Sequence, residues 1–169
     1  MRQENFTEQA QDALGSSQLI VRQFQHSQWD VEHVLLALLQ QDKGVVCQLL
    51  DELGIDIKAI KGEVSAALSK APKAEAGAQI YATPRIAEMF QAAHAEAQRL
   101  QDDFISTEHL FIAIAAESGG QSAEILKHYG IDKEKVYAAL EQLGLSLSIR
   151  PHQVATTDYH QLYKLLENI

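Results

Sequence analysis

The sequence predicts an all-α protein made of a four-helix unit and a second copy of that unit, packed together as one domain. Glu32-His33-Val34-Leu35 recurs as Glu108-His109-Leu110-Phe111, which gives an offset of 108 − 32 = 76 residues. Leu53-Gly54-Ile55-Asp56 recurs as Tyr129-Gly130-Ile131-Asp132 with the same offset of 76. A register that stays constant over this length indicates a duplicated structural unit. Apolar residues recur at helical spacing in both copies, whereas strand patterns are weak.

The first copy, residues 1–68, contains four expected helices with recognisable starts and stops. They cover about residues 7–24, 31–40, 45–53 and 57–68. Thr7 and Asp30 carry short side chains that accept hydrogen bonds from the N–H groups of a first helical turn. Gly54 ends the third helix, because glycine tolerates the left-handed turn that follows a helix. Asp56 then caps the fourth helix.

The second copy, residues 83–143, repeats this punctuation with different residues. Thr83 precedes Pro84, and a proline at the first helical position loses no hydrogen bond. Ser106 is the cap of the second helix, and Gly130 ends the third. Asp132 opens the last helix, whose apolar face holds Val136, Leu140 and Leu143. Because the caps keep their role while their identity changes, the pattern indicates that the fold is duplicated.

Two segments lie outside the copies. Residues 69–82 are rich in Ala, Lys, Gly and Pro, and we expect them to form an exposed linker. Residues 144–169 are expected to hold a second linker and a short C-terminal helix that Asp158 caps. The apolar positions of that helix are Leu162, Tyr163, Leu165 and Leu166.

The composition excludes several classes of function. A formal charge of −9, with 14 scattered basic residues, argues against a nucleic-acid surface. No stretch approaches the roughly 18 to 20 apolar residues of a membrane span, and the N-terminus lacks the apolar core of a secretion signal. A single cysteine, Cys47, forms no internal disulfide. We therefore expect a soluble cytoplasmic protein.

Enzyme and metal signatures are missing from the sequence. It contains no phosphate-binding glycine loop, no dinucleotide motif and no nucleophile elbow. Glu32-His33 and Glu108-His109 resemble fragments of a zinc helix motif, but neither has a second histidine four residues on. Cys47 lies on an apolar helix face and is expected to be a packed thiol. We therefore predict no catalytic residue, no metal site and no enzyme activity for this chain.

Four polar residues near helix starts have two interpretations. Thr7 and Thr83 are helix caps first, but a helix N-terminus also offers N–H groups to an anion or a carboxylate. Glu32 and Glu108 follow the second cap of each copy at the same position, where the helix dipole favours a carboxylate. They either complement the dipole alone or form two acidic spots that hold a basic or guanidinium-bearing ligand.

Leu14 and Phe90 are equivalent apolar residues on the first helices of the two copies. Most residues of this kind belong to a core. Two amphipathic first helices nevertheless leave part of their apolar surface open between them. Such a groove would bind extended or helical apolar segments.

Five motifs together resemble the N-terminal domain of the Clp ATPases, in particular that of the ClpB-type disaggregases. They are Phe6-Thr7-Glu8, Glu32-His33-Val34-Leu35-Leu36-Ala37-Leu38, Leu53-Gly54-Ile55-Asp56, Ala82-Thr83-Pro84-Arg85 and Asp103-Phe104-Ile105-Ser106-Thr107-Glu108-His109-Leu110. The resemblance covers about residues 1–143. It implies two four-helix repeats related by pseudo-twofold symmetry. The tail, 159–167, is similar to the linker helix before the first ATPase ring, although Leu143-Gly144-Leu145 replaces the Arg-Gly-Gly usual in disaggregases.

This resemblance implies a module that binds unfolded or aggregated client proteins and passes them to ATPase rings. The client-binding residues it implies are Thr7, Phe90, Asp102, Glu108 and Leu110, and Leu14, the equivalent of Phe90, completes the predicted site. ATP and magnesium would belong to downstream domains, so no cofactor is expected in this chain. We expect an isolated domain to be monomeric and one attached to ATPase rings to be hexameric, and adaptor proteins are further expected partners.

The ClpC branch of the same family suggests an alternative. There, paired glutamates serve phosphoarginine recognition, which implies an adaptor or phosphoarginine-docking module. The corresponding residues here are Thr7, Glu32, Thr83, Arg85 and Glu108. In this reading the glutamates hold the guanidinium and Arg85 contacts the phosphate. Whether the chain is an excised domain or a stand-alone protein stays open at this point.

Overall fold

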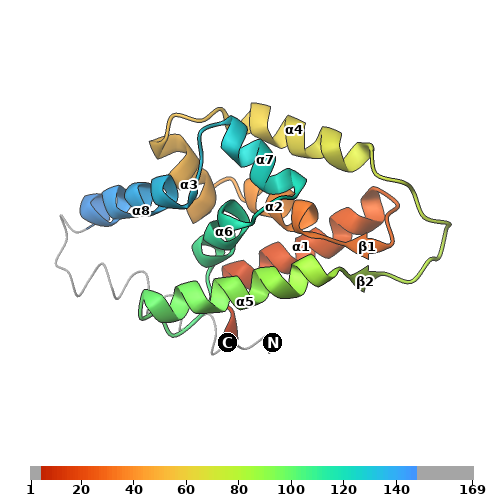
Figure 1. Cartoon of the computed structure of the whole chain (residues 1–169), viewed down its shortest axis with the longest axis horizontal. Coiled ribbons are helices and arrows are strands. Elements are labelled where there is room, and N and C mark those ends of the chain that lie inside the picture. Colours follow the sequence, from red (N-terminus) through yellow and green to blue (C-terminus); the bar gives the residue numbers. More distant parts are fainter. Residues whose placement is uncertain (1–4, 148–169) are drawn as a thin grey trace.

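The described part of the chain, residues 5–147 of a computed structural model, is almost entirely helical (Figure 1). Its helices are α1 (Glu8–Gln23), α2 (Val31–Leu39), α3 (Val45–Glu52), α4 (Ile57–Ser69), α5 (Pro84–Arg99), α6 (Thr107–Ala116), α7 (Gln121–His128) and α8 (Lys133–Leu147). Two short strands are β1 (Gln28–Trp29) and β2 (Tyr81–Ala82). The predicted all-α fold with four helices in each copy is confirmed. The helix expected after Asp158 lies outside the described residues.

The helices begin at the predicted caps, and the third helix of each copy ends at its predicted glycine. The Oγ1 atoms of Thr7 and Thr83 accept hydrogen bonds from the backbone N–H three residues along, at 3.1 and 3.4 Å. Gly54 and Gly130 follow the third helix of each copy with φ of +72° and +74°, a conformation that side chains with a Cβ rarely adopt. The duplicated caps therefore mark real element boundaries.

The last helix is longer than the sequence pattern predicts. α8 continues through Gly144 to Leu147, beyond residue 143. A glycine inside a helix costs about 1 kcal/mol relative to alanine, which does not stop a helix by itself. The side chain of Leu143, one turn before the observed end, packs against the core. This packing favours continuation of the helix.

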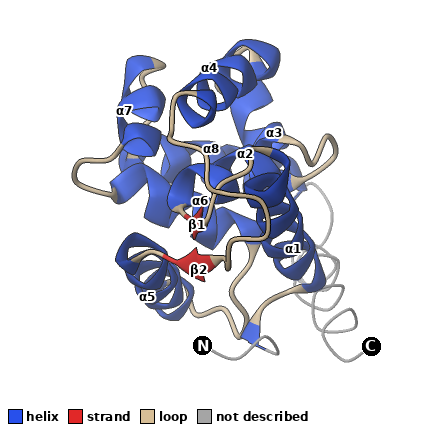
Figure 2. Cartoon of the chain, turned by 90° about the vertical axis from the view of Figure 1, so that its right-hand side faces the viewer, coloured by secondary structure: helices blue, strands red, loops and turns tan. Residues whose placement is uncertain are grey.

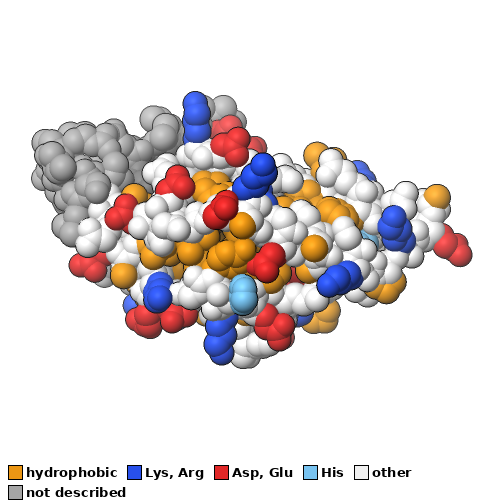
Figure 3. Space-filling model, turned by 90° about the horizontal axis from the view of Figure 1, so that it is seen from above, with side chains coloured by type: hydrophobic (Ala, Val, Ile, Leu, Met, Phe, Trp, Pro, Cys, Tyr) orange, Lys and Arg blue, Asp and Glu red, His pale blue; other side chains and the backbone are white. Residues whose placement is uncertain are grey.

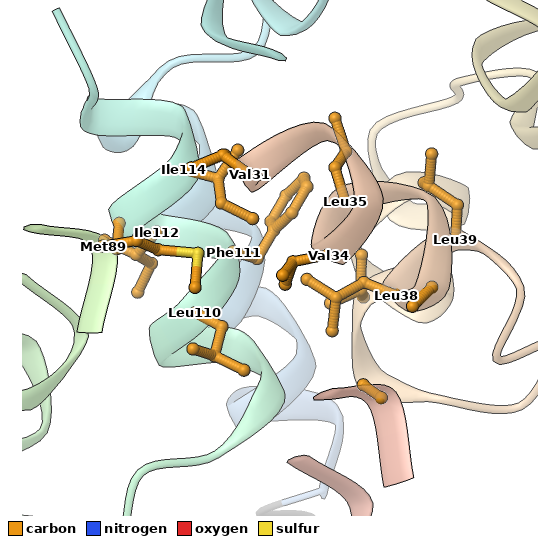
Figure 4. Packing of buried hydrophobic residues seen from close by; sticks show 14 of the residues in the cluster. Val31, Val34, Leu35, Leu38, Leu39, Met89, Leu110, Phe111, Ile112 and Ile114 are labelled. Atoms are coloured by element: carbon orange, nitrogen blue, oxygen red, sulfur yellow. The ribbon is translucent and has the colours of Figure 1, made fainter. Parts of the chain in front are cut away.

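The centre of the molecule is formed by α2 and α6. Every residue from Val31 to Leu39 in α2 is buried, and so is the stretch from Thr107 to Ile114 in α6. Figure 4 shows the side chains of Val34, Leu35 and Phe111 between the two helices. Because other helices surround both, their apolar residues cover the whole helix and not a single stripe.

The start of each copy forms a short parallel pairing with the other copy. β1 and β2 pair in parallel, which attaches the start of α5 to the residues before α2 (Figure 2). At the equivalent place, Phe6 and Ile105 form an isolated parallel bridge, which attaches the start of α1 to the residues before α6. The sequence does not predict these contacts, because strands of one or two residues show no alternation. The copies are thus intertwined.

The segment between the copies is tied down at several points. Most of residues 69–82 are exposed, as expected for a linker. However, the N–H of Ala74 donates to the carbonyl of Gln25 at 2.7 Å, and the segment ends as β2. It therefore acts as a bonded connection that fixes the start of α5.

The surface of the described part is mixed in character. On the face that carries α4 and α7, hydrophobic side chains gather in the middle and charged side chains lie around them (Figure 3). Among residues 5–147, no helix is both long and apolar enough to cross a membrane.

Candidate functional site

Two junctions, related by the 76-residue offset, lie where the start of α5 meets the start of α2 and where the start of α1 meets the start of α6. The first, called the Arg85 junction here, consists of Asp30, Glu32, Thr83, Arg85, Glu117 and Ser122. The second, called the Gln9 junction, consists of the equivalent residues Ser106, Glu108, Thr7, Gln9, Gln41 and Val46. Between them the junctions contain all the residues of the phosphoarginine hypothesis.

The guanidinium of Arg85 is the centre of the first junction. It donates to both oxygens of Glu32 at 3.0 and 2.9 Å, and to both oxygens of Glu117 at 2.7 Å. A fifth bond of 3.1 Å reaches Asp30. Paired bonds of this kind fit the planar fork of arginine and are stronger than neutral hydrogen bonds. The bonds to Glu117 and Glu32 raise the pKa of Arg85 above its ordinary value.

Glu32 also holds the start of α7. Its Oε2 accepts hydrogen bonds from the backbone N–H and the hydroxyl of Ser122, at 3.1 and 2.7 Å. Burial raises the pKa of Glu32, but the hydrogen bonds from Arg85 and Ser122 outweigh this, so its pKa lies below the ordinary value. Thr83 adds a bond of 2.9 Å from its hydroxyl to Asp30. One carboxylate therefore connects α2, α5 and α7.

This geometry gives Arg85 a different place from the one the phosphoarginine hypothesis expects. The structure brings Glu32, Thr83 and Arg85 together, as that hypothesis requires. However, Arg85 lies on Glu32 and so takes the position expected for a ligand guanidinium. A ligand that uses Glu32 would first have to displace Arg85.

The Gln9 junction has two glutamines in place of Arg85 and Glu117 and keeps the glutamate, Glu108. Gln9 stands where the other junction has Arg85, and Gln41 stands where it has Glu117. The Nε2 of Gln41 donates to the carbonyl of Gln9 at 3.1 Å. The side chains of Thr7 and Glu108 are 0% and 3% exposed, so both face the interior. Exchanging two glutamines for an ion pair has thus made the two junctions chemically different.

Histidines complete the caps of α2 and α6. The Nδ1 of His33 accepts the N–H of Asp30 at 3.0 Å, so the proton is on Nε2, which lies 2.8 Å from Nδ1 of His26. In the second copy, the Nδ1 of His109 accepts the N–H of Ser106 at 2.8 Å. These residues stabilise helix starts, and in each case the cap fixes the tautomer of the ring.

The second ring nitrogen of each histidine meets a different partner. The Nε2 of His109 lies 2.7 Å from a carboxylate oxygen of Asp102, whereas that of His33 meets the ring of His26. Burial, with the neighbouring His26, lowers the pKa of His33 to about 4. Burial also lowers the pKa of His26. Asp102, one of the expected client-binding residues, is therefore held by the cap of α6.

An apolar seam lies between α1 and α5. The ring of Phe90 makes edge contacts with Phe6 and Trp29, with centroid distances of 5.6 and 6.0 Å. Leu14 and Phe90 are both half-buried and pack against the core from equivalent positions. The indole N–H of Trp29 donates to Ser17 at 2.8 Å. Apolar atoms at the seam therefore reach the surface on a rigid base.

The expected client-binding residues divide into two groups. Leu14, Phe90 and Asp102 are half-buried and have surface to offer a partner. Thr7 and Leu110 are 0% exposed, and Glu108 is buried as well. The side chain of Leu110 is part of the core that supports α5 and α6 (Figure 4). Periodicity alone does not separate Leu110 from Leu14 and Phe90, because it marks the apolar face of a helix without showing how deeply that face is buried.

The sequence analysis did not single out Glu117 and Ser122, which belong to the Arg85 junction, or His26, which contacts His33. Glu117 and Arg85 both replace glutamines at the equivalent positions, Gln41 and Gln9. Two simultaneous changes to opposite charges are the signal that would have indicated an ion pair. His26 carries no such signal, because its equivalent is the aspartate that pairs with His109.

The fold and the junctions define a class of intertwined, tandem-repeat helical domains. The model of the Clp repeat (R) N-terminal domain matches residues 5–129. The chain belongs to this family.

Relatives and solved structures agree with this assignment. The chaperone protein ClpB of Rhizobium meliloti is 31% identical over 141 residues, which cover 83% of this chain and 16% of that protein. The Hsp104 N-terminal domain of Candida albicans has a TM-score of 0.67 at 15% identity, with 88% of this chain and 93% of that chain covered. A complex of the ClpV N-domain with a VipB peptide has a TM-score of 0.63 at 19% identity, with 78% and 82% covered. The chain spans 16–18% of the length of the curated relatives it matches.

Proposed function

We propose that this chain is the N-terminal client-binding module of an ATP-dependent Clp chaperone. It engages exposed apolar segments of unfolded or aggregated proteins and passes them to ATPase rings, which hold the ATP and magnesium. The observation that carries this proposal is the seam between α1 and α5, where Leu14 and Phe90 offer apolar surface from equivalent positions. The solved complex of a similar N-domain with a peptide supports a polypeptide as the ligand.

The chemistry of the seam fits an apolar segment bound weakly. Half-buried aromatic and aliphatic side chains offer contact area without much loss of side-chain freedom on binding, because their neighbours already hold them. The ring contacts of Phe90 with Phe6 and Trp29 supply this preorganisation. A shallow surface with few anchors gives modest affinity. Weak binding suits a module that has to release its client to a neighbouring ring.

A pair of leucine variants tests the seam. Leu14→Gln removes apolar surface at the seam, whereas Leu19→Gln removes it from an exposed position, 55% accessible, on the same helix. We expect Leu14→Gln to weaken binding of a fluorescent, unfolded apolar polypeptide by about fivefold or more, the size expected for a lost apolar contact. Leu19→Gln should bind like the wild type. Equal effects of both substitutions would show that the chain binds only through general surface hydrophobicity.

A phosphoarginine-docking or adaptor-docking module is the second candidate. The observation in its favour is that the Arg85 junction already accommodates a guanidinium between Glu32 and Glu117. In this candidate, Thr7 and Glu108 of the Gln9 junction serve a ligand, and Glu32 and Thr83 do so once Arg85 is displaced. Calorimetry with phosphoarginine tests it: the candidate predicts binding that Glu108→Gln abolishes. Unchanged affinity in that variant would eliminate it.

A further inference from the structure

A cavity of about 350 Å³ lies on the opposite edge of α5 from the seam. Its apolar lining includes Val31, Met89, Ala92 and Ile114. The segment Ser118–Gly120, between α6 and α7, lines its rim. The volume falls within the range of about 300–1,000 Å³ that ligand pockets occupy. The proposed client site at Leu14 and Phe90 uses none of these side chains.

The wall of this pocket is fixed in place. Arg85 and Glu117 line it, and their paired hydrogen bonds of 2.7 Å hold both side chains still. A Cβ atom added to Gly120 would collide with the guanidinium of Arg85, so only glycine lets the loop approach so closely. A preformed wall lowers the cost of binding, because little has to be ordered when a ligand enters.

At three of the lining positions the residue related by the 76-residue offset is polar. At the equivalent positions, Thr107 stands in place of Val31, Ser16 in place of Ala92, and Gln40 in place of Ala116. The backbone framework is shared by duplication, but at these three positions the pocket has an apolar residue and its symmetry-related counterpart has a polar one. These three substitutions distinguish the pocket from its symmetry-related counterpart.

The charge around the pocket is negative. Glu88 and Glu117 line it directly, and Asp30 and Glu32 lie behind Arg85 within hydrogen-bond distance of the guanidinium. Among the described residues that line the pocket, Arg85 is the only arginine or lysine. The pocket therefore combines an apolar floor with a surplus of carboxylates, and complementary charge favours a cationic partner.

We propose that this pocket is a second client subsite, which takes an aliphatic or aromatic side chain of an extended polypeptide next to a lysine or arginine. The apolar side chain enters the floor formed by Val31, Met89 and Ile114, and the neighbouring basic group lies by Glu88 on the rim. The inference rests on the proposed client-binding function but concerns a separate surface. It adds a sequence preference, apolar followed by basic, that the seam does not supply.

Matched substitutions in the two copies test the subsite. Ala92→Leu fills the pocket, and Ser16→Leu makes the equivalent change in the first copy. For a labelled glycine-serine peptide with a central Leu-Arg pair, we expect Ala92→Leu to weaken binding about tenfold, the loss expected when a buried apolar anchor is excluded. Ser16→Leu should leave binding unchanged. Thermal unfolding of each variant checks that the fold is intact.

A second pair of variants tests the charge without touching the core. Glu88→Gln should weaken the Leu-Arg peptide about two- to threefold and reduce its salt dependence, whereas Asp12→Asn, the equivalent change, should do neither. A Leu-Glu peptide should bind more weakly than Leu-Arg. Equal binding of the two peptides, or unchanged binding in Ala92→Leu, overturns the subsite. If Leu14→Gln alone weakens binding, the subsite is wrong while the seam proposal stands. If no peptide binds, both are overturned.

Discussion

Arg85 contributes more to the stability of the fold than a single surface ion pair does. Its side chain is only 28% exposed and faces three carboxylates, of which that of Glu32 is 8% exposed. Removing one partner from a buried pair leaves the other charge without compensation, which is why such removals cost much more than the pair itself contributes. The equivalent Gln9 and Gln41 show that the fold also permits two glutamines in place of Arg85 and Glu117. The two junctions thus allow an arginine–glutamate pair to be compared with a glutamine pair in one fold.

Arg85→Gln should lower the free energy of unfolding by about 3 kcal/mol, because Glu32 then stays buried without its guanidinium. Adding Glu117→Gln recreates the glutamine pair of the Gln9 junction. We expect the double variant to lose about 1 kcal/mol less than the sum of the single variants. Denaturant unfolding of all four proteins measures this coupling. Additive losses would mean that Arg85 and Glu117 do not form the pair described.

The His26–His33 pair predicts a pH dependence of stability. Because the folded pKa of His33 is lowered to about 4 from 6.5, the fold favours the neutral ring. The stability it supports is complete above pH 6.5 and is lost as the pH falls from 6.5 towards 4. His26→Asp recreates the carboxylate–histidine pair of the second copy. This substitution should raise the pKa of His33 and so remove the loss of stability that His33 causes at acid pH.

An NMR titration of the His33 ring, with unfolding measured at pH 7.5 and pH 5, checks both statements. The matched change Asp102→His should introduce a similar acid sensitivity in the second copy. A His33 pKa near 6.5 in the wild-type protein would contradict the account.

At the scale of elements, the helices were predictable and their cross-attachments were not. Caps such as Thr7 and Thr83 are local signals, so they mark helix starts without any tertiary information. The bridge of Phe6 with Ile105 joins residues distant in sequence and involves too few residues to produce a pattern. Gly144 weakens a helix locally, but α8 continues through it because the neighbouring Leu143 packs against the core. Local rules therefore fix where helices start better than where they end.

The start of α7 offers a prediction that separates strain from steric conflict. Gly119 and Gly120 have φ of +83° and +85°, but only a Cβ at Gly120 would meet other atoms, namely those of Arg85 and Glu117. Gly119→Ala should cost about 1–2 kcal/mol from backbone strain alone. Gly120→Ala should cost about 2 kcal/mol more, because the ion pair must move. Thermal unfolding compares them, and equal losses would contradict the close packing of this loop on Arg85.

At the scale of the whole molecule, duplication explains the fold and divergence explains the candidate sites. The repeat correctly indicates two four-helix units, but it gives no sign that each unit begins on the other. Leu110 was expected in a client groove from resemblance alone, yet it is 0% exposed. Burial of this kind depends on which helices surround α6, and a sequence pattern does not contain that information. The partial exposure of Leu14 and Phe90, by contrast, could be predicted from their equivalent positions on two amphipathic helices.

Intertwining predicts that neither copy folds alone. A fragment of residues 5–68 lacks Ile105, the partner of Phe6, and Phe111, which packs against α2 (Figure 4). We expect this fragment to show no cooperative thermal transition by circular dichroism, whereas residues 5–147 unfold in one transition. Mixing fragments 5–82 and 83–147 should restore helicity. Cooperative unfolding of the 5–68 fragment by itself would contradict the interdependence of the copies.

The most direct test of the central claim is chemical-shift mapping of the isotope-labelled chain during titration with an unfolded apolar polypeptide. The account predicts concentration-dependent shifts at Leu14, Phe90 and Trp29, which line the seam between α1 and α5. Binding should be weak, with a dissociation constant of about 10 μM to 1 mM, because few side chains act as anchors. The absence of shifts at these residues at saturating polypeptide would contradict the assignment of the seam as a client-binding surface.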